Sequence, residues 1–152
     1  MRPPAITPEL IARALRVKID VVEDDPYEQG RRAVLNLGHT VGHALEKLSQ
    51  FELRHGEAVA VGIVVAARIA VALERADPSV SDRIEAILAG WGLPVHCPPL
   101  HAGDIWDAMA HDKKRCGGTL SWILPDAVGE VSIVTEVPQD LVLTVLREMG
   151  AK

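Results

Sequence analysis

Three of the six histidines in this 152-residue sequence fall within one segment, at positions 39, 43 and 55. His39 and His43 are four residues apart, so on a helix their side chains share one face with Cβ atoms about 6 Å apart. His55 begins the next apolar segment, where a loop can fold it back toward the pair. Imidazole is a common zinc ligand, and a catalytic zinc keeps three protein ligands and one open position. The spacing therefore allows a metal site.

Two other interpretations of the same histidines stay open. A histidine pair at this spacing is a weak signal by itself, because such side chains also hydrogen-bond to backbone or carboxylate neighbours within a core. The nearby Arg32, Asn36 and Glu46 make a polar substrate pocket a third alternative. The residue types and their spacing do not choose among a metal site, a pocket and ordinary packing.

Two predicted helices must position these histidines. The first runs from about residue 27 to 48, with leucine and valine spaced for one apolar face. A short loop, residues 49–54, leads into a second helix from about residue 56 to 75, whose alanine, valine and isoleucine content predicts burial on most sides. Its longest apolar run, residues 59–67, is shorter than the roughly 20 residues of a membrane span. We therefore expect a buried core helix and no membrane association.

The remaining segments complete one domain, residues 1–152. Thr7 and Pro8 resemble a helix start, and Ser79 or Ser81 is expected to cap a later helix that ends at Gly90 and Gly92. Two β-branched runs around residues 126–129 predict a hairpin. The fold class is therefore mainly α, a helical bundle with a small β-hairpin near the C-terminus. The other predicted helices span about residues 8–22, 79–90, 104–110 and 138–149.

The composition limits which binding partners and which cellular compartment are expected. The net charge of −5 argues against nonspecific nucleic-acid binding, which normally shows as a basic stripe. Cys97 and Cys116 lack CxxC spacing and are expected to be free thiols in a reducing compartment. The first residues contain no apolar leader segment. These features predict a cytoplasmic protein.

Three blocks of this sequence carry a family resemblance. They read RAVLNLGHTVGHALE from residue 32, HGEAVAVG from residue 55 and HDKKRCGGTLSWILPDAVG from residue 111. In this order and spacing they resemble the C-terminal domain of 3-dehydroquinate synthase, the cyclising enzyme of the shikimate pathway. The segment RVKIDVVEDDPYEQGRR, from residue 16, is also similar to that family. The resemblance covers about residues 10–137.

The resemblance implies a metal- and NAD-dependent carbon–oxygen lyase. Members of the family convert the sugar phosphate 3-deoxy-D-arabino-heptulosonate 7-phosphate to 3-dehydroquinate and phosphate. NAD transiently oxidises a ring alcohol, phosphate leaves, the ketone is reduced, and the opened ring closes by an aldol step. A divalent metal, zinc or cobalt, polarises the oxygen of the oxidised carbon, and cationic groups hold the carboxylate and phosphate.

The family's site residues can be carried over by position. His39 and His55 match metal ligands, whereas His43 matches a substrate-pocket histidine that is not a ligand. The resemblance implies catalytic roles for His43, Glu28 and Lys18. The residues expected to bind substrate are Lys18, Arg32, Asn36, His43 and one of the pair Lys113 and Lys114. Outside the resemblance, the charged residues in this list are also compatible with an exposed surface.

The sequence departs from the family in two respects. It contains no glycine-rich phosphate loop and no leading βαβ pattern, so no residue is assigned to NAD. The third metal ligand of the family, a glutamate, has no counterpart ahead of the first helix. We therefore expect the metal- and substrate-binding half of a 3-dehydroquinate synthase, inactive alone, forming homo-oligomers and requiring a separate nucleotide-binding domain to use NAD. The alternatives are a noncatalytic interaction or small-ligand module and part of another sugar-phosphate cyclase.

Overall fold

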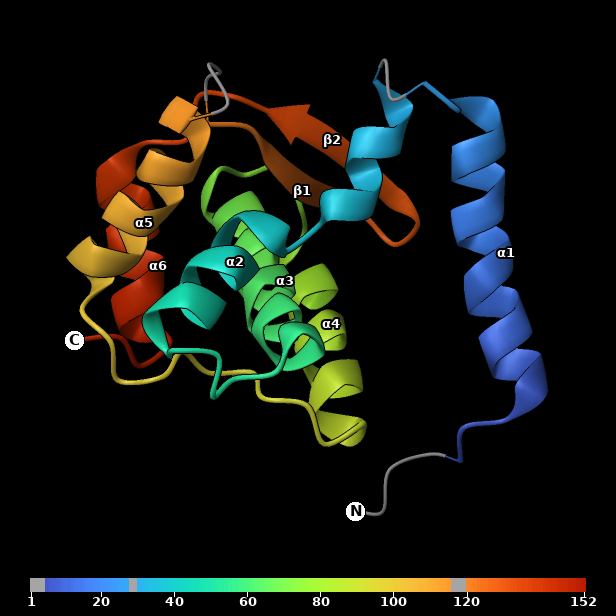
Figure 1. Ribbon diagram of the computed structural model, residues 1–152, viewed down its shortest axis with the longest axis horizontal. Coiled ribbons are helices and arrows are strands. Elements are labelled where there is room, and N and C mark those ends of the chain that lie inside the picture. The colour runs from blue at the N-terminus through green and yellow to red at the C-terminus, as the bar shows by residue number, and fades with distance from the viewer. Residues whose placement is uncertain (1–4, 28–29, 116–119) are drawn as a thin grey trace.

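One long buried helix organises the domain. The computed structural model describes residues 5–27, 30–115 and 120–152. Within these residues, α3 (His55–Ala72) lies at the centre of the bundle (Figure 1). The elements that pack against it are α2 (His39–Leu48), α4 (Pro78–Gly90), α6 (Gln139–Glu148) and strand β1 (Trp122–Ala127). Helix α5 (Ala102–Arg115) packs against α2 and α6. The predicted fold class is confirmed.

The composition of α3 explains its central place. Its valine, isoleucine and alanine side chains point in all directions, and Val61, Val64 and Ile69 have 0% of their surface exposed. The helix has 18 residues and a mean hydropathy of 1.6, so by length and composition it could also cross a membrane. Its side chains instead meet α2, α4, α6 and β1. This burial favours the predicted core helix.

The predicted hairpin is present near the C-terminus. β1 pairs antiparallel with β2 (Glu130–Val134), so that Trp122 lies opposite Val134 and Ile123 opposite Ile133. Gly129 occupies the turn with a φ of 88°, a left-handed conformation that glycine adopts without strain. Trp122 and Leu124 are buried against the core. The hairpin thus closes one side of the bundle above α3.

The single helix predicted for residues 27–48 is wrong. The chain instead forms a short 3₁₀ helix, η1 (Arg31–Asn36), followed by a turn and then by α2. Gly38 has a φ of 79° and accepts the first hydrogen bond of α2 through its carbonyl, from Gly42 at 2.9 Å. A left-handed residue ends any helix that reaches it. The break therefore occurs at Gly38, and His39 becomes the first residue of α2.

The other helix ends follow local capping chemistry. The Thr7 hydroxyl accepts a hydrogen bond from Leu10 N at 3.3 Å, which starts α1 (Pro8–Asp24) where predicted. The expected serine cap of α4 is wrong, because Asp77 provides it by accepting from Ser79 N at 2.9 Å. Asp77 occupies the N-cap position because it directly precedes Pro78, and proline is favoured as the first residue of a helix. Helix α5 is longer at both ends than the predicted segment.

Helix α1 lies apart from the bundle. Among the described elements it packs mainly against η1, and Figure 1 shows it at the edge of the molecule. Only Val21 of this helix is buried. Its remaining large apolar side chains are exposed, including Leu15 at 53% and Val17 at 64%. An amphipathic helix normally buries such a face, so this one is available for a further packing partner.

Cys97 is buried beneath the C-terminal helix, where its backbone N donates to Met149 O at 2.9 Å. Burial raises the pKa of this thiol to about 12, a shift that the positive charge of Arg68 opposes. The thiol is therefore protonated near neutral pH and is a packing group. Cys116 lies outside the described residues.

Candidate metal centre

The three histidines singled out from the sequence come together at one end of the α2–α3 pair. His39 and His43 lie one turn apart on α2, with ring centroids separated by 5.3 Å. His55, the first residue of α3, has its ring centroid 5.3 Å from His39 and 6.0 Å from His43. The expectation that a loop folds His55 back toward the pair is confirmed.

A tight helix ending brings His55 into place. At the end of α2, Gln50 N donates to Lys47 O at 3.3 Å and Phe51 N donates to Glu46 O at 2.9 Å. This pair of bonds is a Schellman motif, which reverses the chain immediately after a helix. Gln50 and Phe51 have φ values of 52° and 64°, in the left-handed region that side chains rarely adopt. The reversal thus carries local strain that the packing of α3 on α2 must offset.

Two glycines fix the distance between α2 and α3 at the histidines. A Cβ on Gly62 of α3 would stand 2.0 Å from the carbonyl oxygen of Gly38. A Cβ on Gly38 would stand 2.6 Å from the side chain of Ile63. The backbones touch because neither residue has a side chain. His39 follows Gly38 directly, so this contact anchors the first histidine against α3.

The N-terminus of α3, which lies at the site, is capped by a residue of its own first turn. Arg54 N donates to the Glu57 carboxylate at 2.9 Å. The negative charge also lies at the positive end of the helix dipole. Glu57 is therefore a capping residue, as its position at a helix start predicts, and it keeps His55 at the first position of α3.

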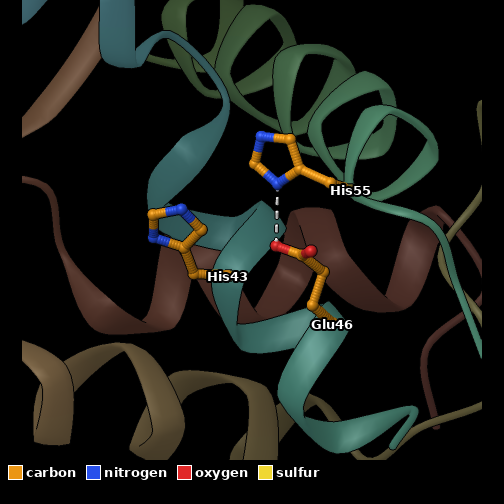
Figure 2. Close-up of side chains that lie close together, drawn as sticks. All are labelled: His43, Glu46 and His55. Carbon is orange, nitrogen blue, oxygen red and sulfur yellow. Dashed lines mark hydrogen bonds and ion pairs between the residues drawn. The ribbon is translucent and has the colours of Figure 1, made fainter. Parts of the chain in front are cut away.

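Glu46, predicted only as a polar neighbour of the histidines, is also part of this site. Its Oε2 lies 3.0 Å from His55 Nδ1, and its side chain is 15% exposed while that of His55 is 57% exposed. His43, Glu46 and His55 each offer a donor atom, and these atoms all lie within 4.8 Å of one another (Figure 2). The sequence spacing could have indicated that Glu46 belongs to the site, because residues 39, 43 and 46 share one helix face.

His39, the other predicted metal ligand, also has its Nδ1 close to an oxygen atom, in this case one of the backbone. His39 Nδ1 lies 3.2 Å from the carbonyl oxygen of Leu37. His43, in contrast, makes ring contacts with the other two histidines, and no hydrogen bond to it is found within the described part of the chain. The three imidazoles therefore differ in how their nitrogens are used.

Some predicted substrate residues lie near η1 and away from the histidines. Arg32 is partly buried, with its backbone N donating to Asp25 at 3.0 Å and its guanidinium donating to Pro26 O at 3.3 Å. Asn36 is exposed at the end of η1. Lys18 is exposed on α1, whose main packing is against η1. Within this single chain, no described contact joins any of the three to the histidine cluster.

The remaining predicted residues have no described side chains. Glu28 lies outside the described residues. Lys113 and Lys114 belong to the last turn of α5, which packs against α2. The roles of these three residues therefore stay predictions.

Comparison with known proteins gives a consistent result. The family model described as 3-dehydroquinate synthase C-terminal matches residues 2–115. The chain is 41% identical over 143 residues to the 3-dehydroquinate synthase of a Synechococcus species, covering 93% of this chain and 39% of that protein. It is 40% identical over 141 residues to the enzyme of the same name from Pyrococcus abyssi, covering 93% of this chain and 41% of that one. The chain thus spans about two fifths of these relatives.

Two solved structures share the fold. A 2-epi-5-epi-valiolone synthase from Streptomyces hygroscopicus subsp. jinggangensis, with NAD+ and Zn2+ bound, superposes with a TM-score of 0.83 at 22% identity, over 93% of this chain and 39% of that one. A 2-deoxy-scyllo-inosose synthase complexed with carbaglucose-6-phosphate, NAD+ and Co2+ superposes with a TM-score of 0.80 at 29% identity, over 92% and 40%. The match of the family model over most of this chain places it in the 3-dehydroquinate synthase family, as a C-terminal domain.

Proposed function

We propose that this chain is the metal- and substrate-binding half of a 3-dehydroquinate synthase. The observation that carries the proposal is the convergence of His39, His43 and His55, with ring centroids 5.3–6.0 Å apart, in a chain of this family. The proposed reaction converts 3-deoxy-D-arabino-heptulosonate 7-phosphate to 3-dehydroquinate and phosphate. Related structures hold NAD+ with Zn2+ or with Co2+, which supports the same cofactors here.

The donor set at the site fits a divalent zinc or cobalt ion. Imidazole nitrogens suit both metals, and we propose that His39 and His55 supply two protein ligands. His43, on the same helix face, is left to hydrogen-bond a substrate hydroxyl and to orient the sugar ring. A bound divalent metal would supply Lewis-acid polarisation of a substrate oxygen.

The proposed roles of the cations follow from their chemistry. A guanidinium binds a carboxylate through two parallel hydrogen bonds, and that of Arg32 now donates only to the Pro26 carbonyl among the described contacts. Lys18 and Asn36 are exposed on α1 and η1. We propose that these three residues reach the substrate when a further domain or subunit closes against α1. NAD is proposed to bind to a separate nucleotide-binding domain.

The first prediction concerns dependence on that domain. The 152-residue polypeptide, supplied with the sugar phosphate, NAD and zinc, is expected to release no phosphate above the uncatalysed background. Addition of the nucleotide-binding half of a related 3-dehydroquinate synthase is expected to restore release, because the nicotinamide then has a binding site. The measurement is a continuous phosphate assay.

The nucleotide-binding half alone serves as the control for this assay. Phosphate release by the pure 152-residue chain would show that it needs no partner. A mixture that stays inactive, together with a chain that binds no zinc, would contradict the proposed function and favour a noncatalytic module.

The second prediction concerns self-association. The apolar face of α1 has no cover among the described residues, so a second copy is the partner open to the pure chain. Light scattering is expected to give a mass of at least about twice the 16.4 kDa of the monomer. The double variant Leu15→Gln/Ile19→Gln is expected to raise the dissociation constant more than about tenfold, because burial of each side chain contributes about 1.5–3 kcal/mol.

Ile87→Gln is the matched control for this prediction. Ile87 lies on α4 and is 50% exposed, similar to Leu15 at 53%. This variant is expected to associate as the unmodified chain does. A monomeric mass for the unmodified chain at high concentration contradicts the prediction.

A further inference from the structure

We propose that Glu46 is a positioning residue that selects the metal-binding nitrogen of His55. The inference rests on the proposed metal site and adds to it a residue without an assigned role. Glu46 extends from α2 toward the start of α3, and Figure 2 shows its carboxylate directed at the His55 ring. The contact from Oε2 to Nδ1 is 3.0 Å.

The chemistry of the two groups fixes which nitrogen carries the proton. An ionised carboxylate accepts hydrogen bonds and donates none. A neutral imidazole donates from one nitrogen and accepts at the other. His55 Nδ1, facing the carboxylate, must therefore be the protonated nitrogen. The lone pair of Nε2, on the far side of the ring, is then free for a metal.

His39 shows the same arrangement with a different acceptor. Its Nδ1 lies 3.2 Å from Leu37 O, and a backbone carbonyl is also an acceptor only. Both proposed ligands thus have Nδ1 directed at an oxygen, and among the described contacts neither Nε2 has a hydrogen bond and His43 has no such acceptor. Metal-binding histidines almost always donate their second nitrogen to a carboxylate, a carbonyl or water. This shared feature separates His39 and His55 from His43.

The burial of Glu46 supports a positioning role. Its side chain is 15% exposed and that of His55 is 57% exposed, so the carboxylate lies behind the ring and the imidazole lies toward solvent. A ligand that approaches from solvent meets His55 first. Glu46 also sits in the last turns of α2, where its own carbonyl accepts Phe51 N at 2.9 Å in the chain reversal that delivers His55. The same residue therefore holds both the backbone and the ring of the site.

The rival role for Glu46 is direct coordination. The donor atoms of His43, Glu46 and His55 lie within 4.8 Å of one another, so these three residues form an alternative ligand set. In that arrangement Glu46 would bind the metal and would not accept a hydrogen bond from His55, and His39 would not be a ligand. The two roles predict different responses to the same substitution.

Glu46→Gln distinguishes the two roles. The glutamine amide oxygen can still accept from His55 Nδ1, but a neutral amide is a poor zinc ligand. Isothermal titration of the full 152-residue chain with zinc is the measurement. A positioning role predicts an affinity within about threefold of the unmodified chain for Glu46→Gln, and a loss of about 10- to 100-fold for Glu46→Ala. Equal large losses in both variants would overturn the proposal in favour of direct coordination.

A second measurement on the metal-free chain keeps the inference separate from the proposed function. Long-range ¹H–¹⁵N NMR at about pH 8, above the ordinary histidine pKa of about 6.5, reports the tautomer of His55. Protonation at Nδ1 in the unmodified chain and in Glu46→Gln, with a mixed population in Glu46→Ala, supports the proposal. Protonation at Nε2 in the unmodified chain overturns it, whether or not zinc binds.

Glu52→Gln is the matched control for both measurements. It removes the same charge from an exposed residue in the loop between α2 and α3. It is expected to change neither the zinc affinity nor the His55 tautomer. Far-UV circular dichroism on each variant verifies that α2 and α3 are retained.

Discussion

Replacement of His39 or His55 by alanine is expected to lower the zinc affinity of the chain by about 100-fold or more. Each substitution removes one of two proposed protein ligands, and loss of an outer partner alone already costs about 10- to 100-fold. His43→Ala is expected to lower the affinity by less than about tenfold, since its imidazole is proposed to face substrate. The measurement is zinc titration in competition with a chromophoric chelator.

The three histidine variants form their own set of controls. They remove the same side chain from positions whose rings lie 5.3–6.0 Å apart, so a nonspecific loss of the polar site would affect all three. If zinc is instead held by His43, Glu46 and His55, then His43→Ala abolishes binding and His39→Ala is nearly neutral. That reversed order would show the proposed ligand pair to be wrong.

Cobalt provides a second observation on the same variants. Its visible absorption depends on the number and type of ligands, so a change in the ligand set alters the spectrum as well as the affinity. His43→Ala is expected to keep the spectrum of the unmodified chain. His39→Ala and His55→Ala are expected to lose it at matched cobalt concentration.

Gly62→Ala is expected to destabilise the domain by about 3 kcal/mol or more. The new methyl group would stand 2.0 Å from the backbone oxygen of Gly38, and no side-chain rotation relieves a clash with backbone. Overpacking of a core typically costs about 1–3 kcal/mol, and backbone displacement adds to that cost. Helices α2 and α3 must then separate at the histidine end. Urea unfolding followed by circular dichroism measures the effect.

Gly56→Ala is the control within the same helix. A Cβ on Gly56 meets no atom within 4 Å, and alanine is favoured over glycine inside a helix by about 0.5–1 kcal/mol. This variant is expected to be as stable as the unmodified chain or more so. Equal stability of Gly62→Ala and the unmodified chain would show that the close contact between Gly38 and Gly62 is not required.

The same clash reaches the metal site. His39 follows Gly38, so displacement of α2 moves its ring away from His55. A folded fraction of Gly62→Ala is therefore expected to bind zinc more weakly than the unmodified chain. The close packing of Gly38 on Gly62 is thus expected to set the position of the neighbouring ligand, His39.

Much of the fold was predictable from local signals. The Thr7–Pro8 helix start and the β-branched strands on either side of Gly129 depend on neighbouring residues only, and both appear where predicted. The burial of α3 follows from an apolar pattern that leaves no polar face. The position of His39 and His43 on one helix face also follows from spacing alone.

One error arose where distant backbone decides local structure, and the other arose from competition between neighbouring capping residues. Residues 27–48 contain an apolar pattern compatible with one helix, but the approach of α3 to Gly38 breaks it at that residue. Asp77 is the N-cap of α4, where a serine was predicted. Its carboxylate precedes the proline that starts the helix, whereas the two serines lie within the helix.

The histidine cluster divides in the same way. The sequence by itself determined which residue types and which family blocks are present, and it placed two imidazoles side by side. Only the tertiary structure decided that His55 returns to them, because the Schellman reversal and the glycine contact set the angle and distance between α2 and α3. It also decided that Glu46 faces Nδ1 of His55, since a hydrogen bond between residues nine apart depends on how two helices pack and not on their spacing in the chain.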